Sequence, residues 1–155
     1  MEVKNIIDGG PKVVIILGNP FETAHEIQQK IKPAQPVVHI GSYHNCWSEI
    51  ADVVLPGQFY SEKKVTFTNK LEQVQSTDIA VQPLRRSRPE WQIIVELANV
   101  FGLKFNFRNV NQVFAAMAEE TKAFSGLSFD QIGDQGMKLK KTFKDTGMKL
   151  VQAPA

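Results

Sequence analysis

The residue types best suited to metal chemistry gather in one short stretch of the chain. His39 lies in an apolar run, and His44 and Cys46 follow it closely. A structural zinc site needs four ligands, and the sequence offers no fourth with suitable spacing. A Cys–His catalytic pair also lacks an acid that could orient the histidine. We therefore expect no metal site, but a histidine at the core edge, an exposed histidine and a buried thiol.

A second candidate site is the turn that follows the first apolar run. Gly18, Asn19 and Pro20 come directly after a predicted strand, where α/β folds place ligand loops. The turn lacks the spaced glycines of a dinucleotide-binding or phosphate-binding loop. Because Asn-Pro is also an ordinary turn starter, we favour a simple turn and keep Gly18 and Asn19 as weak ligand-loop candidates.

A third candidate is a basic cluster that precedes a predicted helix. Arg85, Arg86 and Arg88 crowd its N-terminus, where the helix dipole prefers acidic side chains. Arginines beside free N–H groups suit an anion or an acidic partner surface, although a solvated basic turn is the simpler interpretation. We take the three arginines as candidates for binding a partner protein.

The first half of the chain predicts a parallel layer that would position these candidates. Residues 13–17 form an apolar, β-branched run typical of a strand buried on both faces. A helix capped by Thr23 and Glu26 follows, and residues 37–40 and 51–55 predict two further strands. A helical turn fits between these last two strands. The order strand–helix–strand indicates a βαβ unit with parallel pairing.

The second half predicts a hairpin and then helices. Residues 65–82 alternate like paired strands. Ser87 with Glu90 forms a capping box for a largely buried helix, and Asn109 with Gln112 starts another. The apolar face of the first helix is expected to comprise Trp91, Ile94, Val95, Ala98 and Phe101.

Length, charge and cysteine content limit the classes of function. The chain has 155 residues, a net charge of +2 and one cysteine. A single cysteine excludes a self-contained four-cysteine iron–sulfur cluster, and the small charge gives no reason to expect nucleic acid as a partner. No apolar run reaches membrane-spanning length, so no direct membrane insertion is expected. The predicted fold class is α/β, with a small parallel sheet and βαβ unit, a hairpin extension and a helical C-terminal half.

The series of motifs between residues 51 and 75 resembles one protein family. ADVVLP, then Glu62-Lys63, then TFTN and VQ are similar to the late part of the large domain of molybdopterin oxidoreductases. Pro56-Gly57 with the following Tyr60 resembles most closely the G-type large iron–sulfur subunit of NADH:quinone oxidoreductase, respiratory complex I. On this resemblance, residues 1–136 form a partial molybdopterin-oxidoreductase-like domain and residues 137–155 a basic, partly ordered tail.

The resemblance implies a non-catalytic module that scaffolds the iron–sulfur electron-transfer subunits of complex I. Iron–sulfur clusters and FMN would lie on partner chains, with no cofactor in this chain. The complex would sit peripherally on the cytoplasmic face of a bacterial inner membrane or on the mitochondrial matrix side. The family carries a glycine and an arginine in the loop between TFTN and VQ. Here no glycine lies between Asn69 and Val74, and Gln73 stands at the arginine position, so Asn69 and Gln73 are degenerate pterin-loop positions.

Two alternatives remain open on the sequence. The chain could be the C-terminal fragment of a molybdopterin-dependent oxidoreductase such as a formate dehydrogenase. It could also be a stand-alone α/β domain that binds a small ligand through the Gly18 loop.

Overall fold

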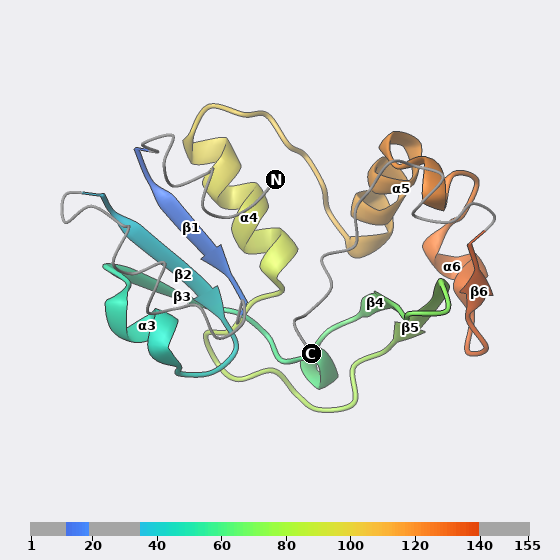
Figure 1. The fold of residues 1–155 in the computed structure, drawn as a ribbon, viewed down its shortest axis with the longest axis horizontal. Coiled ribbons are helices and arrows are strands. Elements are labelled where there is room, and N and C mark those ends of the chain that lie inside the picture. Colours follow the sequence, from blue (N-terminus) through green and yellow to red (C-terminus); the bar gives the residue numbers. More distant parts are fainter. Residues whose placement is uncertain (1–11, 19–34, 140–155) are drawn as a thin grey trace. The chain divides into compact units, whose positions relative to one another are not determined.

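The computed structural model describes residues 12–18 and 35–139 of the chain (Figure 1). The chain divides into two compact units. Unit 1 comprises residues 1–59 and 83–94, and unit 2 comprises residues 60–82 and 95–155. Unit 1 contains a parallel sheet, whereas unit 2 contains an antiparallel sheet and most of the helical residues. The predicted α/β class is confirmed.

Three parallel strands form the sheet of unit 1, in the order β1-β2-β3. They are β1 (Val14–Leu17), β2 (Val37–Gly41) and β3 (Val53–Pro56). Val14 pairs with Val37, and Val38 pairs with Val53. The predicted parallel layer is therefore confirmed. The helix predicted from Thr23 onward lies outside the described residues.

A short helix places the largest core side chain of unit 1. In α3 (Cys46–Ile50), Asn45 Oδ1 accepts hydrogen bonds from the N–H groups of Trp47 and Ser48, at 3.0 and 3.1 Å. Ser48 Oγ accepts one in return from Asn45 N–H at 2.8 Å, which completes a capping box. The helical turn predicted here is confirmed. It packs Trp47 against Ile16 and Val37.

Strand β1 is buried on one face only, which corrects the prediction of burial on both. Ile16 is buried, but Ile15 and Leu17 are 48% and 52% exposed. The physical reason is that side chains alternate between the two faces of a strand. Ile16 lies on the face that packs against Trp47, and Ile15 and Leu17 lie on the opposite face.

The sheet of unit 2 is a hairpin completed by a strand from much later in the chain. The 3₁₀ turn η1 (Tyr60–Glu62) precedes β4 (Val65–Thr68), which pairs antiparallel with β5 (Gln73–Thr77). The predicted hairpin is confirmed, although its second strand ends before residue 82. Strand β6 (Met137–Lys138) pairs with β5. The first residues of the predicted tail thus belong to a sheet, and residues 140–155 lie outside the described residues.

Helix α5 (Val110–Glu120) begins where the sequence predicts. Asn109 Oδ1 accepts the N–H of Gln112 at 3.0 Å, which confirms the predicted cap. The turn η2 (Lys122–Phe124) and helix α6 (Phe129–Ile132) follow. Together with β5 and Leu139 they enclose the apolar core of unit 2. Its buried members are Val74, Phe114, Ala118, Ala123, Phe124, Leu127, Phe129, Ile132 and Leu139.

Helix α4 (Glu90–Val100) starts later than a cap at Ser87 would require, so that prediction is wrong. Ser87 Oγ instead donates to the carbonyl of Leu84 at 2.8 Å. The cause is a contact distant in sequence. The N–H of Arg88 donates to Pro56 O, and Arg88 O accepts from Gln58 N–H, both at 3.1 Å. This pairing with the end of β3 holds Arg88 outside the helix.

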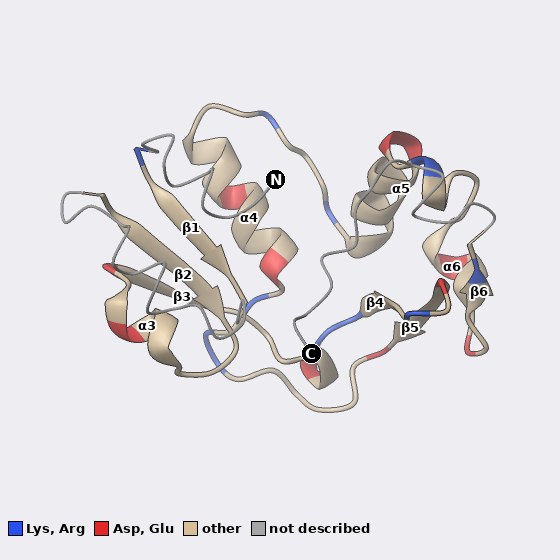
Figure 2. Ribbon diagram, in the orientation of Figure 1, with Lys and Arg blue, Asp and Glu red and all other residues tan. Residues whose placement is uncertain are grey.

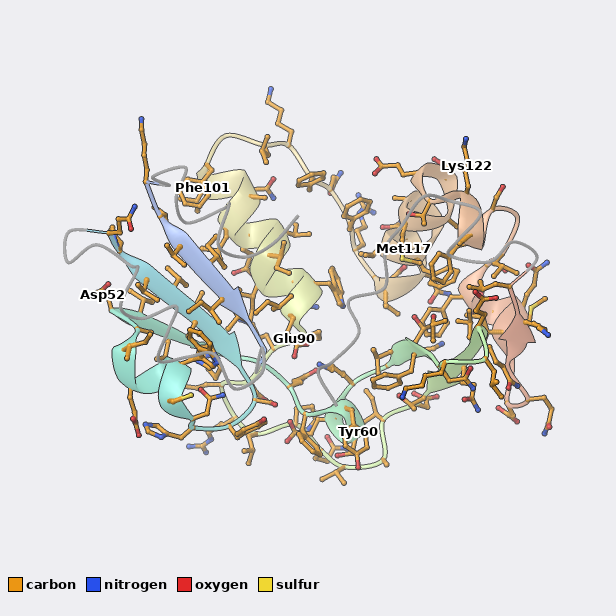
Figure 3. All side chains as sticks on the ribbon, in the orientation of Figure 1. Asp52, Tyr60, Glu90, Phe101, Met117 and Lys122 are labelled. Carbon is orange, nitrogen blue, oxygen red and sulfur yellow. The ribbon has the colours of Figure 1, made fainter. Side chains whose placement is uncertain are left out.

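The predicted burial of α4 is also wrong. Ile93 is buried, but Ile94 is exposed and Phe101, just beyond the helix, is 62% exposed. Figure 3 labels Glu90 and Phe101 at the two ends of this helix. The apolar side chains of α4 itself point to nearly every side of the helix, so their spacing does not predict which face is buried. None of the helices in the described part of the chain has the length and apolar character that crossing a bilayer requires.

Candidate functional site: the carboxyl edge of the parallel sheet

Glycines stand at the carboxyl ends of all three parallel strands in unit 1. Gly18 follows β1, Gly41 ends β2 and Gly57 follows β3. Hydrogen bonds join these ends: Gly18 N–H donates to Ile40 O, and Gly57 N–H donates to Gly41 O, both at 2.8 Å. The carboxyl edge of a parallel sheet is where open α/β folds bind their ligands. Of these glycines, Gly18 leaves the backbone of the edge accessible to close approach, whereas the space beside Gly41 and Gly57 is taken by His39 and Glu90.

Gly18 has the most open surroundings of the three. Its φ is +73°, and a Cβ atom placed on it would meet no atom of the described residues within 4 Å. Among these residues, a side chain there is disfavoured by backbone conformation and not by crowding. The ligand-loop candidate Asn19 lies outside the described residues. The structure places Gly18 at the carboxyl edge of the parallel sheet, and a ligand-binding role for Gly18 and Asn19 stays a prediction.

His39 is fully buried beneath this edge. Its exposed fraction is 0%, and its Nε2 atom lies 2.9 Å from the carbonyl oxygen of Gly18. The sequence predicted a histidine at the core edge; the structure instead buries it fully in the central strand, where its ring bonds to the end of the neighbouring strand. Gly41 also contacts this ring, since a Cβ on Gly41 would lie 2.5 Å from His39 Cε1.

Gly57 brings the start of α4 next to the edge. A Cβ on Gly57 would lie 3.1 Å from Glu90 Oε1, so a side chain there would press on the helix start. The main chain of Arg88 pairs with Gly57. Arg85, Arg86 and Arg88 are all exposed, and Figure 2 shows their segment as the basic stretch that precedes α4. Their role in binding a partner stays a prediction.

The structure places His39, His44 and Cys46 in different surroundings. No cluster of three or more histidine, cysteine, aspartate or glutamate side chains suited to a metal occurs in the described parts of the chain. His39 is buried, whereas His44 and Cys46 are exposed. The expectation of a buried thiol is wrong, because α3 turns Trp47 rather than Cys46 into the core.

The turn between β4 and β5 is the place where the resemblance implies cofactor contacts. It implied a glycine with positive φ, and here Glu72 adopts a φ of 62°. Glu72 is the non-glycine residue with positive φ within the described ranges. Asn69 builds the turn: its Oδ1 accepts the N–H groups of Leu71 and Gln73, at 2.9 and 3.0 Å. The backbone shape of a glycine turn is thus present without the glycine.

The polar groups of this turn are used within the chain. Gln73, at the position of the family's arginine, donates from Nε2 to Gln135 O at 2.9 Å. The carbonyl of Glu72 accepts the N–H of Leu139 at 2.9 Å. An arginine pairs with phosphate through its charge, which an amide lacks. Asn69 and Gln73 therefore stabilise the β4–β5 turn through hydrogen bonds within the chain.

Three features of these sites escaped the sequence analysis. They are the contact between His39 and Gly18, the row formed by Gly41 and Gly57, and the positive φ of Glu72. The signal for the row was present, because each predicted strand is followed or ended by glycine. The other two depend on strand register and turn geometry, which residue types alone do not specify.

Comparison with known proteins gives a family match over residues 1–100, described as molybdopterin oxidoreductase. The chain is 35% identical over 107 residues to the alpha subunit of F420-dependent formate dehydrogenase 2 of Methanococcus maripaludis, covering 67% of this chain and 16% of that protein. It is 27% identical over 147 residues to the alpha subunit of F420-dependent formate dehydrogenase 1 of the same organism, covering 90% and 22%. The chain thus spans less than a quarter of the length of these relatives.

Proposed function

This chain belongs to the molybdopterin oxidoreductase family, and we propose that it is a module of a formate dehydrogenase that works with further polypeptides. The observation that carries the proposal is its similarity to formate dehydrogenase alpha subunits, which extends over 67% and 90% of the chain. One of the sequence alternatives is therefore favoured over the complex I interpretation. Because Cys46 is the only cysteine, iron–sulfur clusters lie outside these 155 residues in this proposal.

The molybdopterin cofactor that the family implies fits one of the two candidate places better than the other. At the carboxyl edge, Gly18 has positive φ and open surroundings, so the backbone can approach a bound group closely. At the β4–β5 turn, Gln73 is uncharged and already bonded to Gln135. We assign the carboxyl edge, and not the turn, to the cofactor side. When bound, the cofactor supplies the metal centre that takes up the electrons released from formate.

The β4–β5 turn favours a second function. Its polar groups are used within the chain, which is what a module without a cofactor of its own requires. In this case the chain scaffolds the iron–sulfur subunits of an NADH:quinone oxidoreductase, with clusters and FMN on its partners. A peripheral position on the inner membrane belongs to this second function. Arg85, Arg86 and Arg88 are the partner-binding candidates in either case.

Substrate-dependent reduction of a dye distinguishes the two functions. The chain is tagged in its native host, purified with whatever it binds under gentle conditions, and assayed with formate and with NADH as electron donors. Formate-dependent dye reduction supports the formate dehydrogenase. Reduction with NADH alone overturns it in favour of the complex I module. A monodisperse, inactive single chain overturns both and supports a stand-alone ligand-binding domain.

A matched pair of glycine variants tests the assignment of the carboxyl edge. Gly18 and Gly126 have similar φ values, +73° and +78°, and neither would crowd a Cβ atom. Gly18→Ala and Gly126→Ala therefore impose similar backbone strain in different places. We expect Gly18→Ala to lower formate-dependent activity several-fold more than Gly126→Ala does. Equal activities in the two variants would remove Gly18 from the cofactor side.

A further inference from the structure

His39 is an unusual residue for the middle of a parallel sheet. It lies in the central strand β2, is 0% exposed, and is flanked by the apolar Val38 and Ile40. Buried polar groups are retained in proteins when hydrogen bonds compensate for their lost hydration. The bonds that His39 makes should therefore reveal what it does.

One ring nitrogen bonds to the end of the neighbouring strand. Nε2 lies 2.9 Å from Gly18 O, and a carbonyl oxygen can only accept, so Nε2 carries the hydrogen. The N–H of Gly18 donates to Ile40 O at 2.8 Å. Both backbone polar groups of Gly18 are thus held by β2. The direction in which the chain leaves β1 is set by these two bonds.

The other ring nitrogen has no such bond. Nδ1 of His39 is buried and has no hydrogen-bond partner among the described residues. The contact to Gly18 is therefore the hydrogen bond that the described part of the chain provides for this buried ring.

Gly41 provides the space for this arrangement. A Cβ atom on Gly41 would lie 2.5 Å from Cε1 and 2.8 Å from Nε2 of His39. Such distances do not occur between unbonded heavy atoms, so any side chain at this position displaces the ring. Gly41, unlike Gly18, does not have a positive φ. This position requires glycine because the imidazole occupies the space of a Cβ atom, and not because of the backbone conformation.

We propose that His39 is a positioning residue of the carboxyl edge, which orients the Gly18 carbonyl through Nε2–H in a slot that Gly41 keeps open. This role rests on the proposed function, because it fixes the backbone of Gly18 at the carboxyl edge that we assign to the cofactor side. His39 acts through Gly18 and has no contact with the reacting atoms in this proposal. Gly18, His39 and Gly41 thus form one set of contacts between the carboxyl ends of β1 and β2.

The ring tautomer is the first test, and it needs no ligand. Long-range ¹H–¹⁵N correlation spectra of the full chain report which nitrogen of each histidine carries hydrogen. We expect a hydrogen on Nε2 of His39, with exposed His44 as the internal reference. A Nδ1–H tautomer, or a spectrum that averages like that of His44, overturns the proposal.

A pair of amide variants tests the bond to Gly18. The side-chain nitrogen of Gln reaches the position of Nε2, whereas that of Asn corresponds to Nδ1 and falls short. His39→Asn should accelerate hydrogen exchange of the Gly18 amide by about five- to tenfold, the effect of losing one net hydrogen bond. His39→Gln should restore most of the protection. The Val74 amide in unit 2 serves as a control for global unfolding. Equal protection in both variants overturns the proposal.

A double-mutant cycle tests the slot. Gly41→Ala should accelerate exchange at Gly18 in the wild-type background, but not in the His39→Ala background, where the ring is absent. Additive effects overturn the pairing of His39 with Gly41. These readouts do not use activity, so the positioning role can fail while formate-dependent activity persists. Conversely, loss of the formate dehydrogenase proposal would leave the tautomer and the cycle unchanged.

Discussion

The carboxyl edge of the parallel sheet and the β4–β5 turn are the two candidate ligand sites of the chain, and they differ in one respect. Gly18 and Glu72 have similar φ values, +73° and 62°, and the carbonyl of each accepts a hydrogen bond within the chain. Gly18 carries no side chain, so a bound group can approach its backbone closely, whereas Glu72 carries one. The residue type at a left-handed position, and not the left-handed conformation alone, distinguishes the two places.

The largest expected effect tests the apolar core of unit 2, which supports the β4–β5 turn. Phe114 is 4% exposed and contacts Phe124 and Phe129 edge to face, at centroid distances of 6.1 and 5.8 Å. Phe114→Ala should lower the free energy of unfolding by about 3–5 kcal/mol. Phe105→Ala is the matched control, because Phe105 is exposed. Denaturant titration of both variants measures the difference, and similar losses would contradict the assigned core.

A smaller effect is expected where β6 approaches β5. A Cβ atom on Gly136, whose φ is +72°, would lie 2.6 Å from Val74 O. Gly136→Ala should therefore destabilise the protein by about 1–3 kcal/mol through crowding in addition to backbone strain. Gly126→Ala has the strain without the crowding, and thermal unfolding of the two variants separates these contributions. If Gly126→Ala is as damaging, the close approach of β6 is not the cause.

Two predicted helix caps differ in the structure, and this difference can be measured. Asn109 caps α5, whereas Ser87 bonds to Leu84 instead of capping α4. Asn109→Ala should cost about 1 kcal/mol of stability. Ser87→Ala should have a smaller effect, because its hydrogen bond is exposed and caps no helix. Chemical denaturation of the two variants would refute the placement of α4 if Ser87→Ala proved the more damaging.

The smallest effect is a gain in stability. Glycine adopts the conformation of Glu72 without the steric penalty of a side chain. Glu72→Gly should therefore stabilise unit 2 by about 0.5–1 kcal/mol. Leu71→Gly, at an exposed neighbouring position, should not stabilise it, because Leu71 has no positive φ. A loss of stability in Glu72→Gly, measured by thermal melting, would show that the carboxylate has a role in the turn.

Features that depend on nearby residues were predictable from the sequence. The strands around Ile16, Ile40 and Val54 follow from their apolar runs, and the cap at Asn109 follows from a local hydrogen bond. Local pattern and final structure agree at these positions because no distant contact competes with them.

Features that depend on distant backbone pairing were not predictable. Ser87 has the sequence of a good cap, yet the pairing of Arg88 with Gly57 decides where α4 begins. In the candidate site, residue types named Gly18 and His39 separately, but only the strand register brings the ring to the Gly18 carbonyl. The exposure of Cys46 likewise depends on which side of a short helix faces the core.

Strand β6 is synthesised long after its partner β5, and this delay affects folding during translation. Gln73 and its partner Gln135 are 62 residues apart, and β6 follows Gln135 directly. At 5–20 residues per second, a ribosome needs roughly 3–12 s to synthesise that interval. During this time the β5 edge of the nascent chain is unpaired, and unpaired edges invite aggregation. We infer that the hairpin needs protection until residue 139 emerges, and protease sensitivity of ribosome-bound chains arrested before and after this residue would measure it.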